Sequence, residues 1–311
     1  MRLSDEGWCV MPDEGRDRAR ESLLGLAVGD AFGERFFDPP EHSGYAIAQR
    51  VPPDPPWPWT DDTALAAALL DHVEAHGGVE QDTLAEQFAA VFGADPRRGY
   101  GPGMFEVFPR IAAGEDWRVV TAEQFGGQGS WGNGTAMRVA PLGVVFAGDL
   151  DRAAEEAARQ AVVTHAHPEA VAGAVAVAVA AGVATALEEA GPAQASALLG
   201  EVVDRVDDSA VRRGLEHVAS LPADTPVADV VAAVGNGVEV SCQDTVPFTV
   251  WMAAHQLDDY EEALWLTATA GGDRDTTCAI VGGIIAARTG AAGIPALWRQ
   301  RCEDPPASQH R

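Results

Sequence analysis

Residues 170–187 read AVAGAVAVAVAAGVATAL, and the fold class follows from this stretch. It contains no charged residue, yet its many alanines and glycines leave it short of the roughly 20 strongly apolar residues that cross a bilayer. A buried helix is the better interpretation, because further segments with helical spacing flank it on both sides. Small side chains let helices approach closely, so the stretch predicts a compact globule of crossing helices.

The rest of the chain repeats the helical spacing and almost never alternates as a strand would. Leu65, Leu69 and Val73, for example, share one helix face. Pro, Gly and Asp at the breaks place further helices at 151–163, 169–190, 193–206, 209–220, 226–235, 245–256, 259–270, 276–289 and 294–302. The expected class is therefore all-α, a compact single-domain globule of orthogonal helices.

The domain limits follow from the same pattern. We expect a flexible N-terminal arm at 1–17, one domain at 18–302 and a flexible C-terminal tail at 303–311. Two stretches inside the domain resist helix assignment: 38–59, with seven prolines, and 97–131, with repeated glycine. Long irregular segments within a compact domain are usually functional, so we expect these two to frame the site.

Composition narrows the function. The chain carries 47 acidic residues against 21 Lys and Arg, and a formal net charge of −26 disfavours non-specific binding to nucleic acid or to anionic membranes. The N-terminus shows no apolar segment that would direct export, and the four cysteines have no CxxC spacing. We therefore expect a cytoplasmic protein with reduced thiols and no membrane contact.

The sharpest local motif is Trp59-Thr60-Asp61-Asp62-Thr63, which opens an amphipathic helix. Thr60 is a good N-cap, and acids in a first turn interact favourably with the helix dipole. A well-capped helix would explain this motif if it stood alone. A second acidic helix start, the segment GGDRDTT at 271–277, precedes another apolar helix and weakens that explanation.

The two helix starts offer only oxygen ligands. Asp273 and Asp275 can reach one ion across a turn, and Thr276 adds a hydroxyl. Carboxylates and hydroxyls without His or Cys are what Mg²⁺ or Mn²⁺ prefer. If the aspartates of the two helix starts converge, two cations would relieve their repulsion, and such sites support displacement chemistry. The expectation is a central dinuclear metal cleft.

A glycine-rich turn, GGQGSWGNG at 126–134, is a third candidate. Five glycines in nine residues let the backbone turn its N–H groups toward an anion. Ser130, Trp131 and Asn133 offer a hydroxyl, an aromatic face and an amide. The turn matches neither the P-loop nor the dinucleotide fingerprint. A helix is expected from Thr135 onward.

Two further polar positions stand out. Asp30 falls on the apolar face of its helix with Leu23 and Leu26, and a buried aspartate needs a partner. It either accepts hydrogen bonds from a neighbouring helix start or serves beside the metal site. His165 and His167 lack the i, i+4 metal spacing, so helix-end capping is favoured, while His165 also suits contact with a sugar hydroxyl or a phosphate.

Taken in order, five segments resemble the ADP-ribosylglycohydrolase family. They are GLAVGDAFG (25–33), WTDDT (59–63), GSWGNGTAMRVAPLG (129–143), THAH (164–167) and GGDRDTT (271–277). The resemblance covers nearly the whole chain. It implies an all-α fold with a central cleft, two Mg²⁺ or Mn²⁺ ions, an ADP-ribosylated substrate such as a modified protein, and ADP-ribose as product.

The resemblance also implies residue roles. It places the metal ligands at Thr60, Asp61, Asp62, Asp273, Asp275 and Thr276. It places the substrate-binding turn at Gly129, Ser130, Trp131, Gly132 and Asn133, and a ligand contact at His165. Asp30 joins the expected substrate-binding set. An aspartate such as Asp62 would help to deprotonate the attacking water.

One position departs from the family pattern. Many members carry a catalytic or metal-guarding glutamate four residues after the GDxxG glycine, where this chain has Phe37. Glu34 is the candidate replacement, and Asp61 or Asp62 alone is the alternative. The acceptor therefore stays open between arginine, serine, a nucleic-acid end and a small molecule. So do three rival functions: an ADP-ribose reader without catalysis, a dinuclear hydrolase of another nucleotide-like substrate, and a metal-free interaction protein.

Overall fold

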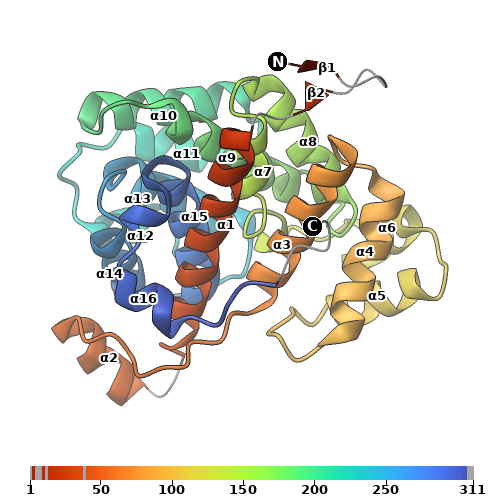
Figure 1. Cartoon of the computed structure of the whole chain (residues 1–311), viewed down its shortest axis with the longest axis horizontal. Helices are drawn as coiled ribbons and strands as arrows, with labels where there is room; N and C mark the ends of the chain where they lie inside the picture. Colours follow the sequence, from red (N-terminus) through yellow and green to blue (C-terminus); the bar gives the residue numbers. More distant parts are fainter. Residues whose placement is uncertain (1, 4–8, 11–12, 38–39, 307–311) are drawn as a thin grey trace.

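The computed structural model describes residues 2–3, 9–10, 13–37 and 40–306. Two short strands, β1 (Arg2–Leu3) and β2 (Cys9–Val10), pair as an antiparallel ribbon. All the longer elements in these ranges are helices, which cross one another at many angles (Figure 1). The all-α class is thereby confirmed, while the central metal cleft stays a prediction.

The helices follow one another along the whole described chain. They are α1 (Asp13–Glu34), α2 (Pro40–Gln49), α3 (Asp61–His76), α4 (Gln81–Ala94), α5 (Met104–Ala112), α6 (Trp117–Gly127), the 3₁₀ helix η1 (Asn133–Thr135), α7 (Ala140–Val145), α8 (Leu150–Val162), α9 (Pro168–Ala186), α10 (Pro192–Arg205), α11 (Ala210–Ala219), α12 (Val227–Val234), α13 (Cys242–His255), α14 (Tyr260–Ala270), α15 (Arg274–Gly293) and α16 (Ala296–Arg301). The helices expected from residue 151 onward all form, with ends within four residues of the expected bounds.

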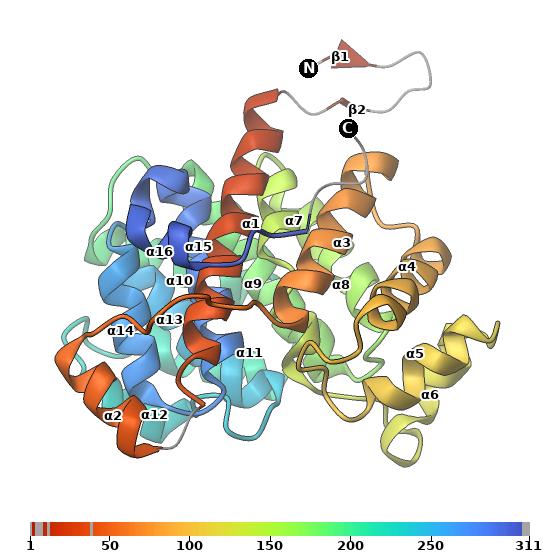
Figure 2. The ribbon, with the colours of Figure 1, turned by 60° about the horizontal axis from the view of Figure 1, so that its bottom comes forward.

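The closest helix pair is α1 against α15, side by side and antiparallel in the middle of the molecule (Figure 2). Gly25, Gly29 and Gly33 are spaced four apart and so share one face of α1. A Cβ at Gly29 would overlap the carbonyl oxygen of Cys278. A Cβ at Gly33 would overlap that of Arg274. Because the two backbones touch, the end of α1 is fixed beside the start of α15.

The stretch quoted first forms α9, a core helix. It is 19 residues long with a mean hydropathy of 1.8 in its most apolar window, so by length and composition it is sufficient to cross a membrane. The expectation that it falls short of a span was therefore wrong. The expectation of a buried helix is confirmed, since 78% of that window is buried by neighbouring helices. A Cβ at Gly143 of α7 would overlap the carbonyl oxygen of Ala178, which shows how closely the small residues let helices approach.

Both stretches that resisted helix assignment contain helices. Residues 38–59 include α2, and 97–131 include α5 and α6. The buried residues of α5 are Met104, Val107, Phe108 and Ile111, an amphipathic spacing that the surrounding glycines obscured. The segment after Thr135 was also wrongly expected to be helical at once. Thr135 ends the 3₁₀ helix η1, a turn follows it, and α7 begins only at Ala140.

The ends of the domain differ from the expected limits. Helix α1 begins at Asp13, so 13–17 is helical and not part of an arm. The flexibility expected at both termini concerns residues that lie partly outside the described ranges, among them 4–8 and 307–311. At the C-terminal side Glu303 accepts hydrogen bonds from Arg98, so this part of the expected tail is bound to the domain.

Candidate functional site

The start of α3, residues 60–63, is one of two acid-bearing corners and is called the α3 corner here. Thr60 is the N-cap, and its Oγ1 accepts a hydrogen bond from the Asp62 N–H at 3.4 Å. Asp30 of α1 lies beneath it and is completely buried. Its carboxylate accepts from the N–H and hydroxyl of Thr60, both at 2.9 Å, and from the N–H and hydroxyl of Thr63, at 3.2 and 2.6 Å.

Asp30 is therefore the buried acceptor for a neighbouring helix start, one of its two expected roles. Its side chain has no exposed surface and accepts four hydrogen bonds. The role that the structure shows for Asp30 is a positioning role, and its expected substrate-binding role stays a prediction. Asp30 holds Thr60 and the first turn of α3 in place.

The second acid-bearing corner is the start of α15, residues 271–277, and is called the α15 corner. Asp273 is its N-cap residue and makes no side-chain capping bond within the helix. Instead its Oδ2 accepts from Asn133 Nδ2 at 2.7 Å, and the same amide donates to Thr245 Oγ1 at 3.1 Å. Gly272 has a φ of +70°, and a Cβ there would overlap the backbone of Asn236. Glycine is needed at this turn for both reasons.

The structure brings the two corners together. Burial raises the pKa of Asp62 well above its usual range, and four neighbouring carboxyls raise it further: Asp30, Asp275, Asp61 and Asp273. Burial, followed by Asp273 and Asp30, has the same effect on the pKa of Asp275. Burial and then Asp30 raise the pKa of Asp61 to about 8. Five carboxyl groups, contributed by α1, α3 and the α15 corner, thus lie close enough to interact, those of Asp30, Asp61 and Asp62 being buried and those of Asp273 and Asp275 half-buried.

The residues of this region fit a hard divalent cation. Oδ1 of Asp62 and Oδ1 of Asp275 are both buried without a hydrogen-bond partner. A buried acceptor of this kind calls for a donor or a cation. The hydroxyls of Thr60 and Thr276, each residue 4% exposed, complete an oxygen-only set.

The carboxylates alone do not complete a coordination shell. Across residues 13–37 and 40–306, and the short ribbon before them, no three Asp, Glu, His or Cys side chains form a ready group around one ion. Mg²⁺ commonly binds through one or two carboxylates and keeps water or substrate oxygens for the rest. The arrangement suits that mode better than an all-protein cage.

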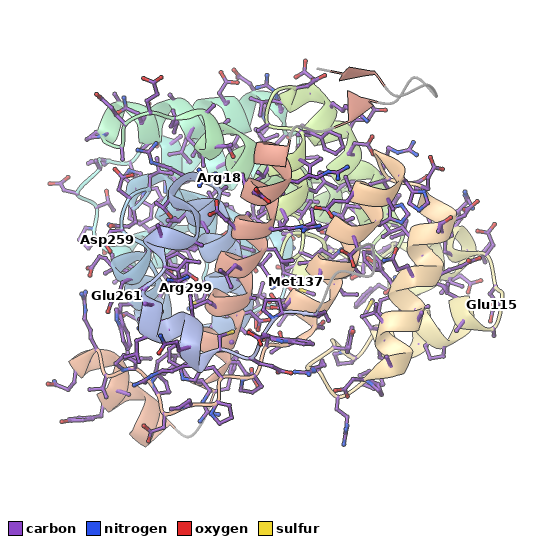
Figure 3. The ribbon with its side chains drawn as sticks, in the orientation of Figure 1. Arg18, Glu115, Met137, Asp259, Glu261 and Arg299 are labelled. Carbon is purple, nitrogen blue, oxygen red and sulfur yellow. The ribbon has the colours of Figure 1, made fainter. Side chains whose placement is uncertain are left out.

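The glycine-rich turn packs against the α15 corner, and three of its backbone N–H groups are already bonded within the protein, while anion binding by the rest of the turn stays a prediction. The N–H groups of Gly129, Gly132 and Asn133 donate to protein oxygens, those of Gln124 O, Ser130 Oγ and Val240 O. The turn also offers side chains. Asn133 is tied to Asp273, Ser130 is buried, and the Trp131 ring is partly exposed. Met137, just beyond the turn, lies among the central helices (Figure 3).

His165 and His167 have different surroundings. His167 is the N-cap of α9, with Nδ1 accepting from the Glu169 N–H at 3.1 Å, so capping is confirmed, although at the start of α9 and not at the end of α8. His165 is 6% exposed, and its ring lies against the backbone of Gly132 and Gly134. It therefore belongs to the same surface as the glycine-rich turn.

Glu34 and Phe37 lie where α1 ends, next to the α15 corner. Glu34 is half-buried, and the preceding Gly33 touches Arg274 and the backbone of Asp275. Phe37 is 49% exposed. Proximity makes Glu34 a neighbour of the acids, and its catalytic role stays a prediction.

Comparison with known proteins agrees with this geometry. Residues 11–310 match the family model described as ADP-ribosylglycohydrolase, which is almost the entire chain. This chain belongs to the ADP-ribosylglycohydrolase family. The family hydrolyses ADP-ribosyl bonds, so the chain is an ADP-ribosyl hydrolase.

Individual relatives support the family assignment. The human protein named ADP-ribosylhydrolase ARH3 is 28% identical over 92% of this chain and 89% of its own length. An uncharacterized protein of Archaeoglobus fulgidus is 30% identical over 93% and 92%. ADP-ribosylarginine hydrolase Tri1 of Serratia proteamaculans is 23% identical over 93% and 76%. A solved structure titled ADP-ribosylglycohydrolase-related protein complex shares the fold, with a TM-score of 0.64, 24% identity and 94% of each chain covered.

Two residues of this ADP-ribosylglycohydrolase, Phe125 and Arg138, were missed by sequence reasoning, and Thr245 of α13 joins the same surroundings through a hydrogen bond. Phe125 is 55% exposed at a φ of +51°, and its ring centroid lies 4.7 Å from that of Trp131. Thr245 shares the Asn133 amide with Asp273. Arg138 is completely buried beside the turn. Only Phe125 gave a signal, as an aromatic side chain directly before two glycines.

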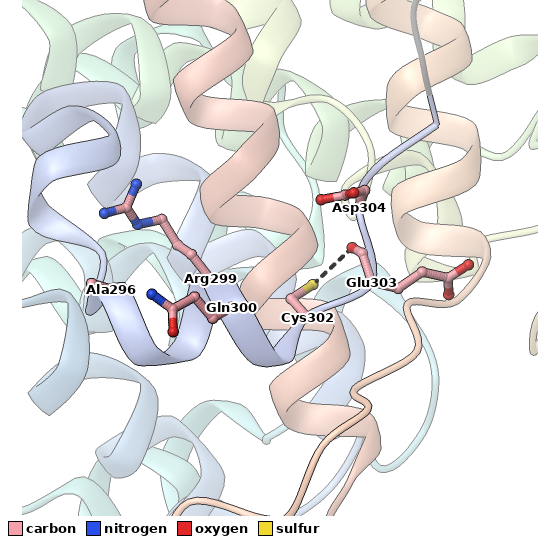
Figure 4. Close-up of a pocket in the computed structure, with 6 residues that line it drawn as sticks. All are labelled: Ala296, Arg299, Gln300, Cys302, Glu303 and Asp304. Atoms are coloured by element: carbon pink, nitrogen blue, oxygen red, sulfur yellow. Dashed lines mark hydrogen bonds between the residues drawn. The ribbon is translucent and has the colours of Figure 1, made fainter.

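One hollow in this ADP-ribosylglycohydrolase lies away from the acids. It measures about 570 Å³ and is lined by the C-terminal segment: Ala296, Arg299, Gln300, Cys302, Glu303 and Asp304 (Figure 4). Within it the Cys302 thiol donates to the carbonyl oxygen of Glu303 at 3.2 Å. No residue of either corner lines this hollow, so it is not the candidate active site.

Proposed function

We propose that this enzyme cleaves the glycosidic bond between ADP-ribose and its acceptor in a reaction that requires two Mg²⁺ or Mn²⁺ ions. The observation that carries the proposal is the meeting of the α3 corner and the α15 corner around Asp30. So many carboxyls in one region repel one another unless positive charge or protons compensate them.

The proposed ligands come from both corners. They are Thr60, Asp61 and Asp62 of α3, and Asp273, Asp275 and Thr276 of α15. When bound, the divalent cations supply Lewis acidity and compensating charge next to the ribose. Asp62 would then take a proton from the attacking water. Its Oδ1 is buried without a hydrogen-bond partner, so this oxygen is free to accept that proton. Asn133 keeps Asp273 in orientation through its 2.7 Å hydrogen bond.

The rest of the ADP-ribosyl group is assigned to the glycine-rich turn. Phe125 and Trp131 present neighbouring aromatic faces on which a nucleobase can stack. Gly132 follows Trp131 beside His165, and Asn133, the next residue, donates to Asp273. We therefore propose that the base stacks on the rings and that the distal ribose binds at the two corners.

For the acceptor we propose a side chain of a modified protein. The loop before α13 lies over the α15 corner, since a Cβ at Gly237 would come within 2.8 Å of Asp273 Cβ. The same loop exposes Val238 (67%) and Val240 (55%). Exposed apolar residues at the rim suit contact with a protein surface. Arginine is the first acceptor to test, given that the Serratia relative is named an ADP-ribosylarginine hydrolase.

The test is release of ADP-ribose from arginine-linked and serine-linked ADP-ribosyl proteins, with Mg²⁺ or with a chelator. We expect release only with the cation, and a loss of about 100-fold or more in Asp275→Asn, in the range seen when a charge-stabilising group is removed. Asp229→Asn is the matched control, because Asp229 is an exposed acid in the first turn of α12. Chelator-resistant release, or full activity of Asp275→Asn, would refute the metal-dependent reaction.

A second candidate function is binding of ADP-ribose with only weak hydrolysis. The observation that favours it is Phe37, half-exposed at the end of α1 where many family members carry glutamate. Tight calorimetric binding of ADP-ribose together with only slow release from every acceptor, with Mg²⁺ present, would decide for this binding role. Replacing Phe37 by Glu should then raise the rate of release, because it restores the acid that many family members carry there.

We also propose a cytoplasmic location. Cys242 and Cys278 are free and buried, a state that suits a reducing compartment. Fractionation of the source cells would test this, and recovery in an exported fraction would contradict it.

A further inference from the structure

A chain of buried polar groups leads from Arg138 to His165. Arg138 is completely buried, and its Nε donates to Gln160 Oε1 at 2.8 Å while its Nη2 donates to Thr164 Oγ1 at 2.9 Å. Thr164 Oγ1 lies 2.8 Å from His165 Nδ1. The Phe88 ring sits 4.4 Å from the guanidinium carbon. Within the described ranges no carboxylate pairs with this arginine, so its hydrogen bonds serve neutral partners.

The direction of each hydrogen bond follows from chemistry. A guanidinium can only donate, so Thr164 Oγ1 accepts from Arg138. The hydroxyl hydrogen of Thr164 then has two possible acceptors: His165 Nδ1 at 2.8 Å and the carbonyl oxygen of Ala161 at 3.5 Å. An O–H···O bond at 3.5 Å is well outside the usual range of about 2.5–3.0 Å. The hydrogen therefore points to Nδ1, which must be the unprotonated nitrogen of the ring.

The other ring nitrogen faces the glycine-rich turn. A Cβ added at Gly132 would lie 3.1 Å from His165 Nε2, and one at Gly134 would lie 3.3 Å from it. With Nδ1 unprotonated, a neutral ring carries its hydrogen on Nε2. Burial, and next the positive charge of Arg138, lower the pKa of His165 to about 3, which agrees with a neutral ring.

We propose that Arg138 and Thr164 are positioning residues that fix His165 as a neutral Nε2–H donor directed at the glycine-rich turn. The ligand partner of this donor rests on the proposed function: it is an oxygen of the ADP-ribosyl group, a phosphate or hydroxyl oxygen that accepts a hydrogen bond. The opposite tautomer would present a lone pair, which a phosphate oxygen cannot bind because it only accepts hydrogen bonds, and a hydroxyl would have to donate in place of accepting.

The tautomer can be observed without substrate or metal. Long-range ¹H–¹⁵N spectra of the imidazole rings distinguish Nε2–H from Nδ1–H. We expect His165 of the wild type and of Thr164→Ser to remain the Nε2–H form between pH 5 and 8. We expect Thr164→Val, which loses the hydroxyl at nearly equal volume, to populate both forms. An Nδ1–H ring in the wild type, or an unchanged single tautomer in Thr164→Val, would overturn the proposal.

Affinity for ADP-ribose is the second readout. We expect Thr164→Val to bind ADP-ribose about tenfold more weakly and Thr164→Ser to bind within about twofold of the wild type, since one hydrogen bond to a charged group is at stake. Thermal unfolding of both variants shows whether each is folded. Equal affinity of Thr164→Val and the wild type would overturn the positioning role. A wild type that binds no ADP-ribose would refute the proposed function and the ligand role of His165, while the tautomer result would stand by itself.

Discussion

The α3 corner and the α15 corner carry similar sequences but are held in place by different forces. The α3 corner rests on one buried side chain, Asp30, which accepts four hydrogen bonds from Thr60 and Thr63. The α15 corner accepts a hydrogen bond, from Asn133 to Asp273, and is otherwise fixed by contact of backbones, at Gly33 against Arg274 and at Gly272 against Asn236. The first corner depends on hydrogen bonding and the second mainly on close packing.

The difference has a common cause in α1. One face of this helix presents Gly25, Gly29 and Gly33 to α15, while Asp30 points to α3. A single helix therefore sets the position of both acid pairs. It follows that the two corners should respond to different substitutions, and four predictions test this.

The largest effect is expected at the glycine face. Gly29→Val places a side chain where even a Cβ overlaps the carbonyl oxygen of Cys278, so we expect a loss of about 3 kcal/mol or more in the free energy of unfolding. Urea denaturation followed by circular dichroism measures it. The control is Gly93→Ala in α4, where nothing lies within 4 Å, and this change should stabilise the helix by about 0.5–1 kcal/mol. Similar stabilities for the two variants would contradict the packing account.

The next effect is expected at the buried acid. Asp30→Asn keeps the shape but replaces an acceptor oxygen by an NH₂ group that faces the donors of Thr60 and Thr63. We expect a loss of about 2–3 kcal/mol, since hydrogen bonds to a buried charged group are removed. Hydrogen exchange should show faster opening at the start of α3 than at the start of α15. Equal opening at both corners would show that Asp30 does not distinguish them.

Lowering the pH should reduce the free energy of unfolding through a histidine in α3, a residue type that α15 lacks. Burial, followed by the neighbouring His76, lowers the pKa of His72 in α3 from 6.5 to about 4, and α15 contains no histidine. Between these two values only the unfolded chain binds the proton, so this contribution to stability is complete above pH 6.5 and is lost as the pH falls to 4. We expect about 2 kcal/mol less stability at pH 4.5 than at pH 7.5 from this source.

His72→Gln is the control for the acid effect. The amide can still accept from the Glu80 N–H but does not titrate. Unfolding midpoints of both proteins at the two pH values give the contribution of His72 as a double difference. If the two proteins lose the same stability on acidification, His72 is not the source.

The smallest effect has the opposite sign. In the absence of cations, Asp275→Asn removes one of several mutually repelling carboxyls, so we expect a gain of about 1 kcal/mol. Differential scanning calorimetry in chelator measures the gain. Adding Mg²⁺ should then stabilise the wild type and not the variant. A variant that is destabilised without cations would mean that the acids are not crowded.

The sequence predicted the helices and the local chemistry well, because both depend on neighbouring residues. Thr60 caps α3 as its residue type suggests, and the acceptor role of Asp30 follows from its place on an apolar helix face. Helix spacing failed only where Gly and Pro are frequent, as in α2, α5 and α6. There the amphipathic pattern exists but turn residues interrupt it.

Features that depend on distant segments were harder to predict. Gly25, Gly29 and Gly33 form the face of α1 that packs on α15. The sequence of α1 alone does not show which helix packs against that face. Anion binding by the glycine-rich turn stays a prediction, while N–H groups such as that of Asn133 find protein acceptors from a loop more than a hundred residues away, at Val240 O. Buried Arg138 could not be expected either, since arginine is rarely buried.

The central claim is that the α3 corner and the α15 corner share bound cations, and calorimetric titration with Mn²⁺ tests it most directly. We predict that the wild type binds two ions and that Asp62→Asn, from one corner, and Asp275→Asn, from the other, each weaken binding at least tenfold. Asp229→Asn should bind as the wild type does. Unchanged Mn²⁺ binding in either corner variant, or no binding by the wild type at millimolar Mn²⁺, would contradict the claim.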